Sequence, residues 1–337
     1  MRMRGLVVVI TGASSGIGRA TALACARRGA RVVLAARSEE SLRAVAAQCS
    51  AAHREAEGFA VPTDVTDVAA VHALAAAATS RYGRIDVWVN SAAVGILGRF
   101  DQMPPAELRR LLDVNLLGAV HGARAAIPVM HRQGHGLLID IASMLGGAVQ
   151  APYMSGYAMS KAALTTFDHV LRQELSLIGA HGITVCSMLP GAVDTPFFHN
   201  AANHTGRRLR SMPPVATPER VARAVVGAVR RPRRRVLVGP YTRLLALAYA
   251  LAPRLVRSAV TWRTEHAYFG APGTAPQTTG TLYTPSARNA AVRGGRGSGW
   301  RTALRRGAAA AAAGGATALV VRATARSPGL PQGRGRR

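Results

Sequence analysis

A tyrosine and a lysine four residues apart give this sequence its clearest chemical signal. Tyr157 and Lys161 lie near the start of a predicted helix, where a spacing of four places both side chains on one face. Lys161 is the only lysine in the chain, and the other 42 of the 43 basic residues are arginine. Because arginine replaces lysine so widely here, the retained lysine indicates a position that needs a compact ammonium whose proton can shift.

An ammonium beside a phenol changes the chemistry of the phenol. The pKa of a free phenol is about 10, and an ammonium about 4 Å away stabilises the phenolate by roughly 4 kcal/mol at an effective dielectric constant of about 20. This brings the pKa of Tyr157 toward neutrality, where the phenol can exchange a proton with a substrate oxygen. Ser143 follows the apolar run Leu137–Ala142, and its hydroxyl is placed to hold that oxygen.

A glycine-rich turn near the N-terminus predicts a site for a dinucleotide. The run Leu6–Ile10 leads directly into Thr11-Gly12-Ala13-Ser14-Ser15-Gly16-Ile17-Gly18-Arg19 and then into a segment with helical periodicity. Glycine lets the backbone approach a pyrophosphate closely. The helix N-terminus then presents free N–H groups and the positive end of its dipole to the phosphates.

The end of the next strand indicates which nicotinamide cofactor binds. NAD sites usually place Asp or Glu there to bond the ribose 2′-hydroxyl, whereas Arg accommodates a 2′-phosphate. Arg37 follows the run Arg31–Ala35, and no acidic residue occurs before Glu39. We therefore expect NADP(H) rather than NAD, with Arg37 at the 2′-phosphate; the alternative is a solvated arginine at a strand end.

These groups need a sheet whose strands end at a common edge. Short apolar runs are expected as strands at Leu6–Ile10, Arg31–Ala35, Gly58–Val61, Ile85–Val89, Leu137–Ala142, Thr184–Leu189 and Val236–Val238. Helical periodicity occurs between them at 16–28, 39–49, 67–82, 105–132, 155–179 and 217–230. Continuous apolar runs are typical of strands covered on both faces. The pattern predicts a Rossmann-like α/β fold, a doubly wound parallel seven-stranded sheet with helices on both faces and ligands at the carboxyl ends of its strands.

Together these motifs resemble those of the short-chain dehydrogenase/reductases, in the branch with Thr-Gly-x-x-x-Gly-x-Gly and Tyr-x-x-x-Lys. The resemblance covers residues 5 to about 240 and implies hydride transfer between a nicotinamide and a carbonyl or alcohol carbon. It implies that Tyr157 is the general acid/base, that Ser143 positions the substrate oxygen, and that Lys161 lowers the tyrosine pKa and binds the nicotinamide ribose. Asn115 would complete a proton relay through a local distortion of its helix.

The same resemblance assigns contacts to the cofactor. Asp64 would contact the adenine, and Pro190-Gly191 with Thr195 would lie beside the nicotinamide carboxamide. The expected cofactor-binding residues are Gly12, Ser14, Ser15, Gly16, Ile17, Gly18, Arg37, Asp64, Val65, Asn90, Tyr157, Lys161, Pro190, Gly191 and Thr195. Two features depart from the family: Asn90-Ser91-Ala92-Ala93 replaces Asn-Asn-Ala-Gly, and the loop between Ser143 and Tyr157 is one residue longer than usual.

The composition excludes several other classes of protein. The 337 residues carry 43 basic and 16 acidic side chains, a net charge of +27, and 49% of them are hydrophobic, so the whole chain cannot be disordered. Three widely spaced cysteines exclude a disulfide scaffold and a paired-cysteine zinc site. The sequence offers no cysteine pair to complete a zinc site with its histidines, so we expect no metal. The N-terminus lacks a signal-peptide pattern, and we expect a cytoplasmic protein.

The chain divides into three predicted parts. Residues 1–240 form the NADP-binding catalytic domain, 241–269 an apolar helical extension, and 270–337 a low-complexity basic tail that we expect to be disordered. The stretch 243–262 is expected to pack on the domain or on a second subunit, with contact to a membrane surface as the alternative. The tail, with Gly307–Val321, offers a second candidate for membrane contact but is short for a span. Specific nucleic-acid binding is not expected, because the basic tail lacks interleaved aromatic residues.

The sequence thus predicts an NADP(H)-dependent oxidoreductase that acts on a small-molecule carbonyl/alcohol pair. Phe197 and Phe198 lie in a segment, 194–216, that would cover the substrate, and they favour an apolar one. By resemblance we expect a homodimer or homotetramer. The alternative is a non-catalytic dinucleotide-binding sensor or scaffold protein of the same fold, against which the intact set of four catalytic residues argues.

Overall fold

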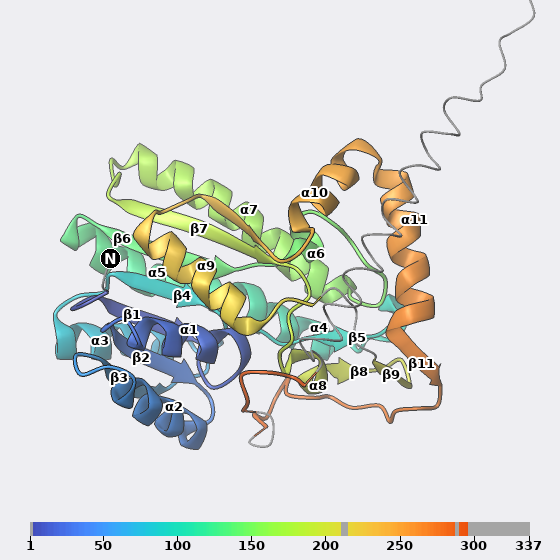
Figure 1. The fold of residues 1–337 in the computed structure, drawn as a ribbon, viewed down its shortest axis with the longest axis horizontal. Helices are drawn as coiled ribbons and strands as arrows, with labels where there is room; N and C mark the ends of the chain where they lie inside the picture. The colour runs from blue at the N-terminus through green and yellow to red at the C-terminus, as the bar shows by residue number, and fades with distance from the viewer. Residues whose placement is uncertain (1–2, 210–214, 287–289, 296–337) are drawn as a thin grey trace, which may run out of the picture. The chain divides into compact units, whose positions relative to one another are not determined.

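Seven parallel strands form the centre of the molecule, as the sequence predicted. The computed structural model describes residues 3–209, 215–286 and 290–295. The strands are β1 (Val7–Thr11), β2 (Arg31–Ala36), β3 (Glu57–Pro62), β4 (Val87–Asn90), β6 (Gly136–Ile141), β7 (Ile183–Pro190) and β10 (Arg235–Val238). Their order in the sheet is β10-β7-β6-β4-β1-β2-β3, and every neighbouring pair is parallel (Figure 1). The order reverses direction between β1 and β4, where sheets of this kind bind their ligands.

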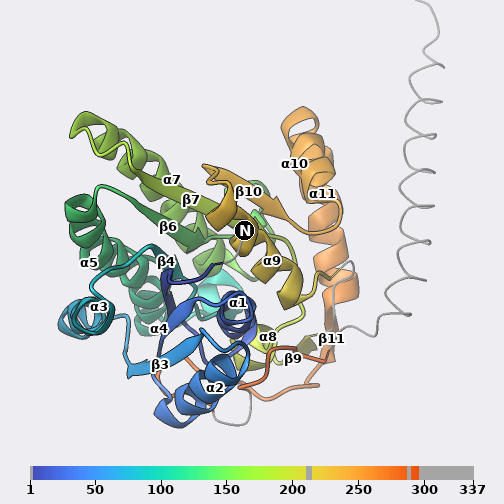
Figure 2. The ribbon, with the colours of Figure 1, turned by 60° about the vertical axis from the view of Figure 1, so that its left-hand side comes forward.

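Helices cover both faces of the sheet because side chains along a strand alternate in direction. The helices are α1 (Gly16–Ala26), α2 (Glu39–Ala51), α3 (Val68–Tyr82), α4 (Pro105–Leu112), α5 (Gly118–Gln133), α7 (Ser155–Leu177) and α9 (Pro218–Arg230). Val8 and Ile10 of β1 share one buried cluster with α1, α2 and α9, whereas Val7 and Val9 share another with α3, α4, α5 and α7. The turned view in Figure 2 shows these two helical layers, and the predicted architecture is confirmed.

One predicted helix is interrupted. The segment expected to be helical over 105–132 forms α4, a π-helical turn at Asp113–Leu117, and then α5. Asn115 lies in the middle of this wider turn, and such single turns occur frequently at functional sites. The distortion that the family resemblance implied at Asn115 is therefore present.

Short elements gather beyond the carboxyl ends of the strands. They are β5 (Ile96–Leu97), η1 (Phe100–Gln102), α6 (Met144–Gly147), α8 (Phe197–Asn200), β8 (Ala202–Asn203) and β9 (Arg207–Leu209). β5 pairs with β8, and β9 pairs with β11 (Phe269–Pro272) of the C-terminal part. These pairings connect the segments that follow β4 and β7, which places them over the edge of the sheet where the chemistry is expected.

After β10 the chain forms α10 (Thr242–Leu251) and α11 (Pro253–Arg263), and Pro253 begins the second helix. A second π-helical turn, Thr264–Tyr268, contains Glu265. The Glu265 carboxylate accepts a hydrogen bond from the Tyr153 hydroxyl (2.5 Å) and forms an ion pair with Arg207 (2.7 Å). The extension is thereby joined to the loop that precedes Tyr157.

Part of the segment expected to be a disordered tail lies against the domain. The described residues belong to one compact unit, and Leu282 is only 1% exposed. The sequence of this segment has no hydrophobic periodicity that would predict a helix or strand. The segment is held in place by hydrogen bonds from arginine side chains of the domain to its backbone carbonyls. The rest of the expected tail, including Gly307–Val321, falls outside the described residues. Within the described ranges, no helix combines the length and hydropathy that a membrane span requires.

Candidate active site

The turn after β1 is built so tightly that only glycine fits at two positions. Gly12 has φ +66°, and a Cβ there would lie 2.7 Å from the Ala92 Cα; a Cβ at Gly18 would lie 2.2 Å from the Gly12 carbonyl oxygen. The Thr11 hydroxyl oxygen accepts hydrogen bonds from the N–H groups of Ser91 (3.1 Å) and Ala92 (3.3 Å). Thr11 thus holds the turns after β1 and β4 together, a role that the sequence analysis did not assign to it.

The N-terminus of α1 carries the donors expected to face the phosphates. The helix begins at Gly16, and Ser15 makes no side-chain cap, so the first N–H groups remain available to other acceptors. The Gly16 N–H donates to the carbonyl of Ala291 (3.0 Å), and the Arg19 guanidinium donates to the carbonyl of Ala290. Ser14, Ser15 and Ile17 are half-buried along the same turn.

Arg37 lies at the end of β2, as predicted, but it contacts the chain's own backbone. Its guanidinium donates to the carbonyl oxygens of Thr281 (2.6 Å), Tyr283 (2.9 Å) and Leu282 (3.1 Å). Because one guanidinium binds three oxygen acceptors, the position beside Arg37 at the end of β2 suits a ligand group with several oxygen atoms. The neighbouring Ser38 instead caps α2, where its hydroxyl accepts from the Ser41 N–H (3.4 Å).

Asp64 and Val65 follow β3 beside Arg37. The Asp64 carboxylate accepts from the Thr66 N–H (3.0 Å) and hydroxyl (2.8 Å) and pairs with Arg110 (2.8 Å). Burial raises the pKa of Asp64, but the hydrogen bonds with Thr66 and Arg110 lower it by more, so this pKa lies below its usual value. Arg110, from α4, was not among the predicted residues, because only the tertiary fold brings it to the end of β3.

The Asn90 side chain points into the protein interior. Its oxygen accepts from the Trp88 indole (2.8 Å), and its amide donates to Asp140 (2.7 Å) and to the carbonyl of Ala119 (3.1 Å). These three bonds use the side chain to join β4, β6 and α5. The cofactor contact expected of Asn90 stays a prediction, and the side chain has a structural role of its own.

Pro190, Gly191 and Thr195 lie at the end of β7 and in the loop beyond it. The Gly191 N–H donates to the carbonyl of Val238 (2.9 Å), which joins this loop to β10. Thr195 is 6% exposed, and a Cβ at Gly16 would lie 3.3 Å from its Cβ. The loop expected beside the nicotinamide therefore meets the N-terminus of α1.

Ser143 and Tyr157 come together from separate elements. Ser143 follows β6, and its hydroxyl accepts from the Leu145 N–H (3.1 Å); Tyr157 is half-buried in the first turn of α7. Burial raises the pKa of Tyr157 to about 12, and a hydrogen bond with Ser143 opposes that rise. Ser143 and Tyr157 therefore lie close together at the carboxyl end of β6.

Lys161 is almost completely buried one turn along α7, at 3% exposure. Its Nζ donates to the carbonyl of Ile141 (2.8 Å) and lies 5.8 Å from the centre of the Tyr157 ring. Burial lowers the pKa of Lys161 to about 8, opposed by the buried carboxyl groups of Asp140 and Asp168. Burial raises the pKa of Tyr157, so the expected lowering of this pKa by the ammonium is not found here.

Asn115 lies beneath these groups and is held rigidly. Its side-chain oxygen accepts from the Val94 N–H (2.8 Å), and its amide donates to the Val94 carbonyl (2.9 Å) and to Ser160 (3.3 Å). Ser160 in turn donates to the Tyr157 carbonyl (2.8 Å). Asn115 is thus connected to the first turn of α7, and the four predicted catalytic residues occupy one region.

An apolar wall faces the Tyr157 ring. The rings of Phe197 and Tyr157 meet edge to face at 5.2 Å, and Phe198 packs on Phe197 at 5.3 Å. The full cluster comprises Leu97, Leu145, Met154, Tyr157, Phe197, Phe198, Ala201 and Leu209. Phe197 and Phe198, from the segment expected to cover the substrate, therefore lie beside the Tyr157 ring.

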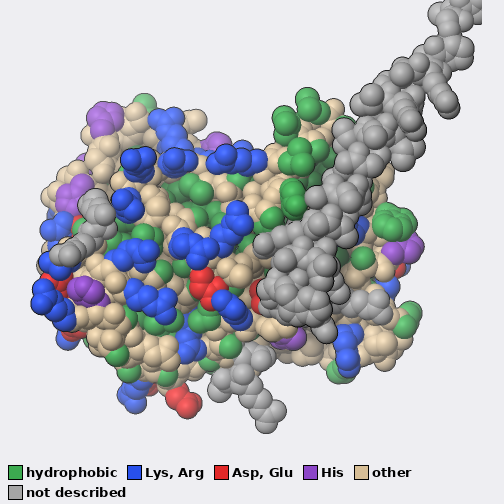
Figure 3. All heavy atoms as spheres, in the orientation of Figure 1, with side chains coloured by type: hydrophobic (Ala, Val, Ile, Leu, Met, Phe, Trp, Pro, Cys, Tyr) green, Lys and Arg blue, Asp and Glu red, His purple; other side chains and the backbone are tan. Residues whose placement is uncertain are grey.

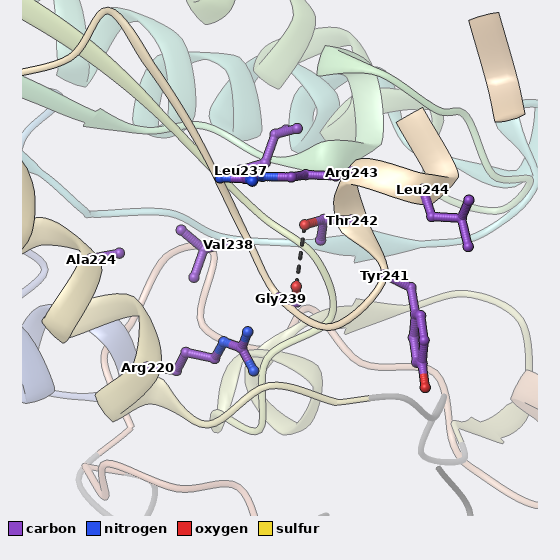
Figure 4. Close-up of a pocket in the computed structure, with 9 residues that line it drawn as sticks. All are labelled: Arg220, Ala224, Leu237, Val238, Gly239, Tyr241, Thr242, Arg243 and Leu244. Atoms are coloured by element: carbon purple, nitrogen blue, oxygen red, sulfur yellow. Dashed lines mark hydrogen bonds between the residues drawn. The ribbon is translucent and has the colours of Figure 1, made fainter. Parts of the chain in front are cut away.

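A separate hollow of about 540 Å³ opens beside the end of β10, between α9 and α10 (Figure 4). Its lining consists of Arg220, Ala224, Leu237, Val238, Gly239, Tyr241, Thr242, Arg243 and Leu244. The Thr242 hydroxyl in its wall donates to the carbonyl of Gly239 (3.2 Å). The lining of this hollow does not include Asn115, Ser143, Tyr157 or Lys161. Across the described residues, no three His, Cys, Asp or Glu side chains gather as metal ligands would.

Comparison with known proteins agrees with this geometry. A family model described as short chain dehydrogenase matches residues 6–206. The uncharacterized oxidoreductase YxnA of Bacillus subtilis is 35% identical over 277 residues, which cover 79% of this chain and 75% of YxnA. A metagenomic short-chain oxidoreductase solved with NADP is 32% identical, with a TM-score of 0.60 over 71% of this chain and 99% of its own. A short-chain dehydrogenase/reductase from Burkholderia phymatum solved with NAD is 26% identical, with a TM-score of 0.66 over 76% of this chain and 97% of its own.

Proposed function

Because this chain belongs to the short-chain dehydrogenase family, we propose that it is an NADP(H)-dependent oxidoreductase that interconverts a carbonyl and an alcohol. The observation that carries the proposal is the meeting of Ser143 and Tyr157 at the edge of the sheet that also bears the glycine turn. A proton donor and a dinucleotide-binding turn are the two parts that such a reaction needs.

The residues at the turn fit a dinucleotide. Among the described residues, the Arg19 Nε is buried without a hydrogen-bond partner, and such an orphaned cationic donor suits a phosphate oxygen. The Gly16 N–H and the Arg19 guanidinium would hold the pyrophosphate, and Asp64 with Val65 would border the adenine. Pro190, Gly191 and Thr195 would border the nicotinamide, which supplies or accepts the hydride when the cofactor is bound.

Tyr157 acts as the proton donor in reduction. With its pKa raised to about 12, the phenol is protonated at neutral pH, which is the form that gives a proton to a developing alkoxide. Ser143 holds the substrate oxygen beside this proton. Lys161 and Asn115 position the first turn of α7, and the Lys161 ammonium provides the positive charge that a phenolate left after proton transfer requires.

The preference for NADP(H) rests on the arginine at the end of β2. Arg37 already binds three carbonyl oxygens, and a 2′-phosphate offers the same kind of acceptor with added negative charge. No acidic residue lies at this strand end to bond a ribose 2′-hydroxyl as NAD sites require. The NADP complex of the metagenomic relative supports this choice, and the NAD complex of the Burkholderia relative is the competing precedent.

The substrate is an apolar small molecule. The aromatic and aliphatic side chains around Tyr157 leave Ser143 and Tyr157 as the polar pair in a mainly hydrophobic surrounding. Burial of apolar surface would supply most of the binding free energy, and the hydroxyl pair would orient the carbonyl.

The chain also has an exposed apolar surface suited to self-association. Leu244, Leu247, Leu251 and Leu255 of α10 and α11 are between 56% and 77% exposed, and hydrophobic side chains gather over α10 in Figure 3. Such a patch is unusual on a free monomer. We propose that a homodimer or homotetramer covers this leucine patch. The alternative partner is an anionic membrane surface, because arginines flank the leucines.

A substrate panel tests the proposed reaction. NADPH absorbance would be followed with ketones, aldehydes, steroids and acyl thioesters, each with the wild-type chain and with Ser143→Ala. Carbonyl-dependent NADPH oxidation that Ser143→Ala reduces at least about a hundredfold is expected, since one lost hydrogen-bond donor of this kind has that effect. NADPH oxidation that needs no carbonyl, or that Ser143→Ala leaves unchanged, would contradict the proposal.

A further inference from the structure

A stretch of the C-terminal part follows the path expected for the dinucleotide. We call residues 278–286 and 290–295 the C-terminal strap. In Figure 1 it belongs to the orange-to-red trace that passes α8 toward the N-terminal half of the sheet. It contacts the domain at three places, which correspond to the adenine, phosphate and nicotinamide ends of the proposed cofactor site.

At the adenine end, the strap uses the donors that a 2′-phosphate would need. Arg37 donates to the carbonyls of residues 281–283, and Arg110 donates to the carbonyl of Leu282 (3.2 Å). The Leu282 side chain is 1% exposed and belongs to the same buried cluster as Val65 and Val94. An apolar group buried beside Asp64 and Val65 takes the place expected for an adenine ring.

At the phosphate end, the strap caps the N-terminus of α1. The Ala291 carbonyl accepts from the Gly16 N–H (3.0 Å), and the Ala290 carbonyl accepts from Arg19. Carbonyl oxygens carry partial negative charge, so they satisfy donors that would otherwise face phosphate oxygens.

At the nicotinamide end, the strap lies directly on the loop after β7. A Cβ at Gly294 would lie 2.3 Å from the Thr195 carbonyl oxygen, and the Gly294 carbonyl contacts His199 Nε2 (3.1 Å). Both ends of the strap are anchored: Arg293 pairs with Glu219 (3.0 Å), and Thr278 exchanges backbone hydrogen bonds with Asn203 (2.8 and 3.1 Å).

We propose that the C-terminal strap is an internal competitor of the cofactor, which occupies the dinucleotide groove and must leave it before NADP(H) binds. The inference rests on the proposed function, because it takes these residues as the cofactor site. The Gly16 N–H and the Arg37 guanidinium cannot serve the strap and the phosphates together. The apparent dissociation constant for the cofactor therefore equals the intrinsic value divided by the fraction of molecules whose strap is open.

Weakening the strap in the full chain tests this competition. Leu282→Ser removes the buried anchor, and Leu177→Ser is the matched control, because Leu177 is 86% exposed at the C-terminal end of α7. Dissociation constants for NADPH and for 2′,5′-ADP would be measured by titration calorimetry. Leu282→Ser is expected to bind both at least about tenfold more tightly than wild type, equivalent to about 1.4 kcal/mol, with Leu177→Ser unchanged.

A second variant and a second readout cover the case in which Leu282→Ser unfolds. Gly294→Ala changes only the strap, and its added methyl collides with the Thr195 carbonyl, so the same gain in affinity is expected. Saturating NADPH should also speed hydrogen exchange at the Thr281 amide, which donates to the Asn200 carbonyl (2.8 Å) in the closed arrangement.

Three results would overturn the competition. Unchanged affinity in both strap variants would show that the strap does not limit binding, and weaker affinity would make it part of the cofactor site. In either case wild-type binding of NADPH leaves the proposed function standing. If neither wild type nor the variants bind NADPH or NADH, the proposed function fails together with the inference.

Discussion

Lys161 Nζ donates to the Ile141 carbonyl and lies 5.8 Å from the centre of the Tyr157 ring. Both groups are strongly affected by burial, which favours the neutral form of each: the pKa of the phenol rises to about 12 and that of the ammonium falls to about 8. A neutral phenol suits the reductive direction, in which Tyr157 gives its proton away. At the scale of single residues, Lys161 rather than Tyr157 is the group that titrates near neutrality.

The pH dependence of reduction should therefore follow Lys161. Its ammonium is present below about pH 8 and is lost as the pH rises through that value, whereas Tyr157 stays protonated. We expect kcat/KM for carbonyl reduction to fall above about pH 8, approaching tenfold per pH unit. In Lys161→Arg the guanidinium keeps its charge, so the residual kcat/KM should not fall above about pH 8. If kcat/KM of Lys161→Arg still falls above about pH 8, a group other than Lys161 causes the fall.

Arg37 should determine the choice between the two cofactors. Removing a charge-assisted contact costs about 1.5–3 kcal/mol, so Arg37→Ala should lower kcat/KM for NADPH about 10- to 150-fold. Release of the strap by the same change would affect NADPH and NADH alike, so the ratio of their kcat/KM values is the measurement. Arg43→Ala, which removes an exposed pair with Glu39 on α2, is the control. Equal loss with both cofactors would remove Arg37 from the 2′-phosphate site.

At the scale of elements, the turn after β1 depends on contact between backbones. Gly12→Ala combines a left-handed φ of +66° with a collision against Ala92, whereas Gly83→Ala has φ +74° and open space around the new Cβ. Gly83→Ala should cost about 1–2 kcal/mol of folding free energy from its backbone alone. Gly12→Ala should cost distinctly more and should also weaken NADPH binding, as denaturant titration and calorimetry would measure. Similar losses in the two variants would show that the approach to Ala92 is not tight.

The elements themselves could be predicted from the sequence, because their signals are local. Strands such as Val7–Thr11 are continuous apolar runs, and their burial between two helical layers requires that pattern. The π-helical turn at Asn115 left no break in the helical periodicity, and only the family resemblance indicated it. The strap could not be predicted, because Leu282 is one of few large apolar residues in a Gly-, Pro- and Thr-rich segment, and its partner Arg110 is 172 residues away in the sequence.

At the scale of the whole molecule, the pair α10–α11 should mediate assembly. The Leu247→Ser/Leu251→Ser double variant removes two leucines that are 56% and 77% exposed, so its own fold should be little affected. Light scattering is expected to show an oligomer for the wild type and a single chain for the double variant. Flotation with anionic vesicles tests the alternative that this surface binds a membrane. A wild-type protein that is monomeric and floats with the vesicles, together with a double variant that does not float, would favour the membrane and contradict assembly.

The central claim is that the Tyr157 hydroxyl carries the proton, and one comparison tests it directly. Tyr157→Phe removes only that oxygen, and Tyr249→Phe is the control because its hydroxyl donates to Gln150 instead. NADPH affinity and turnover of one proven carbonyl substrate would be measured in wild type and both variants. Tyr157→Phe should bind NADPH within about twofold of wild type while kcat falls about 10²- to 10⁴-fold, and Tyr249→Phe should match wild type. A Tyr157→Phe variant that keeps more than about a tenth of the wild-type rate would contradict the account.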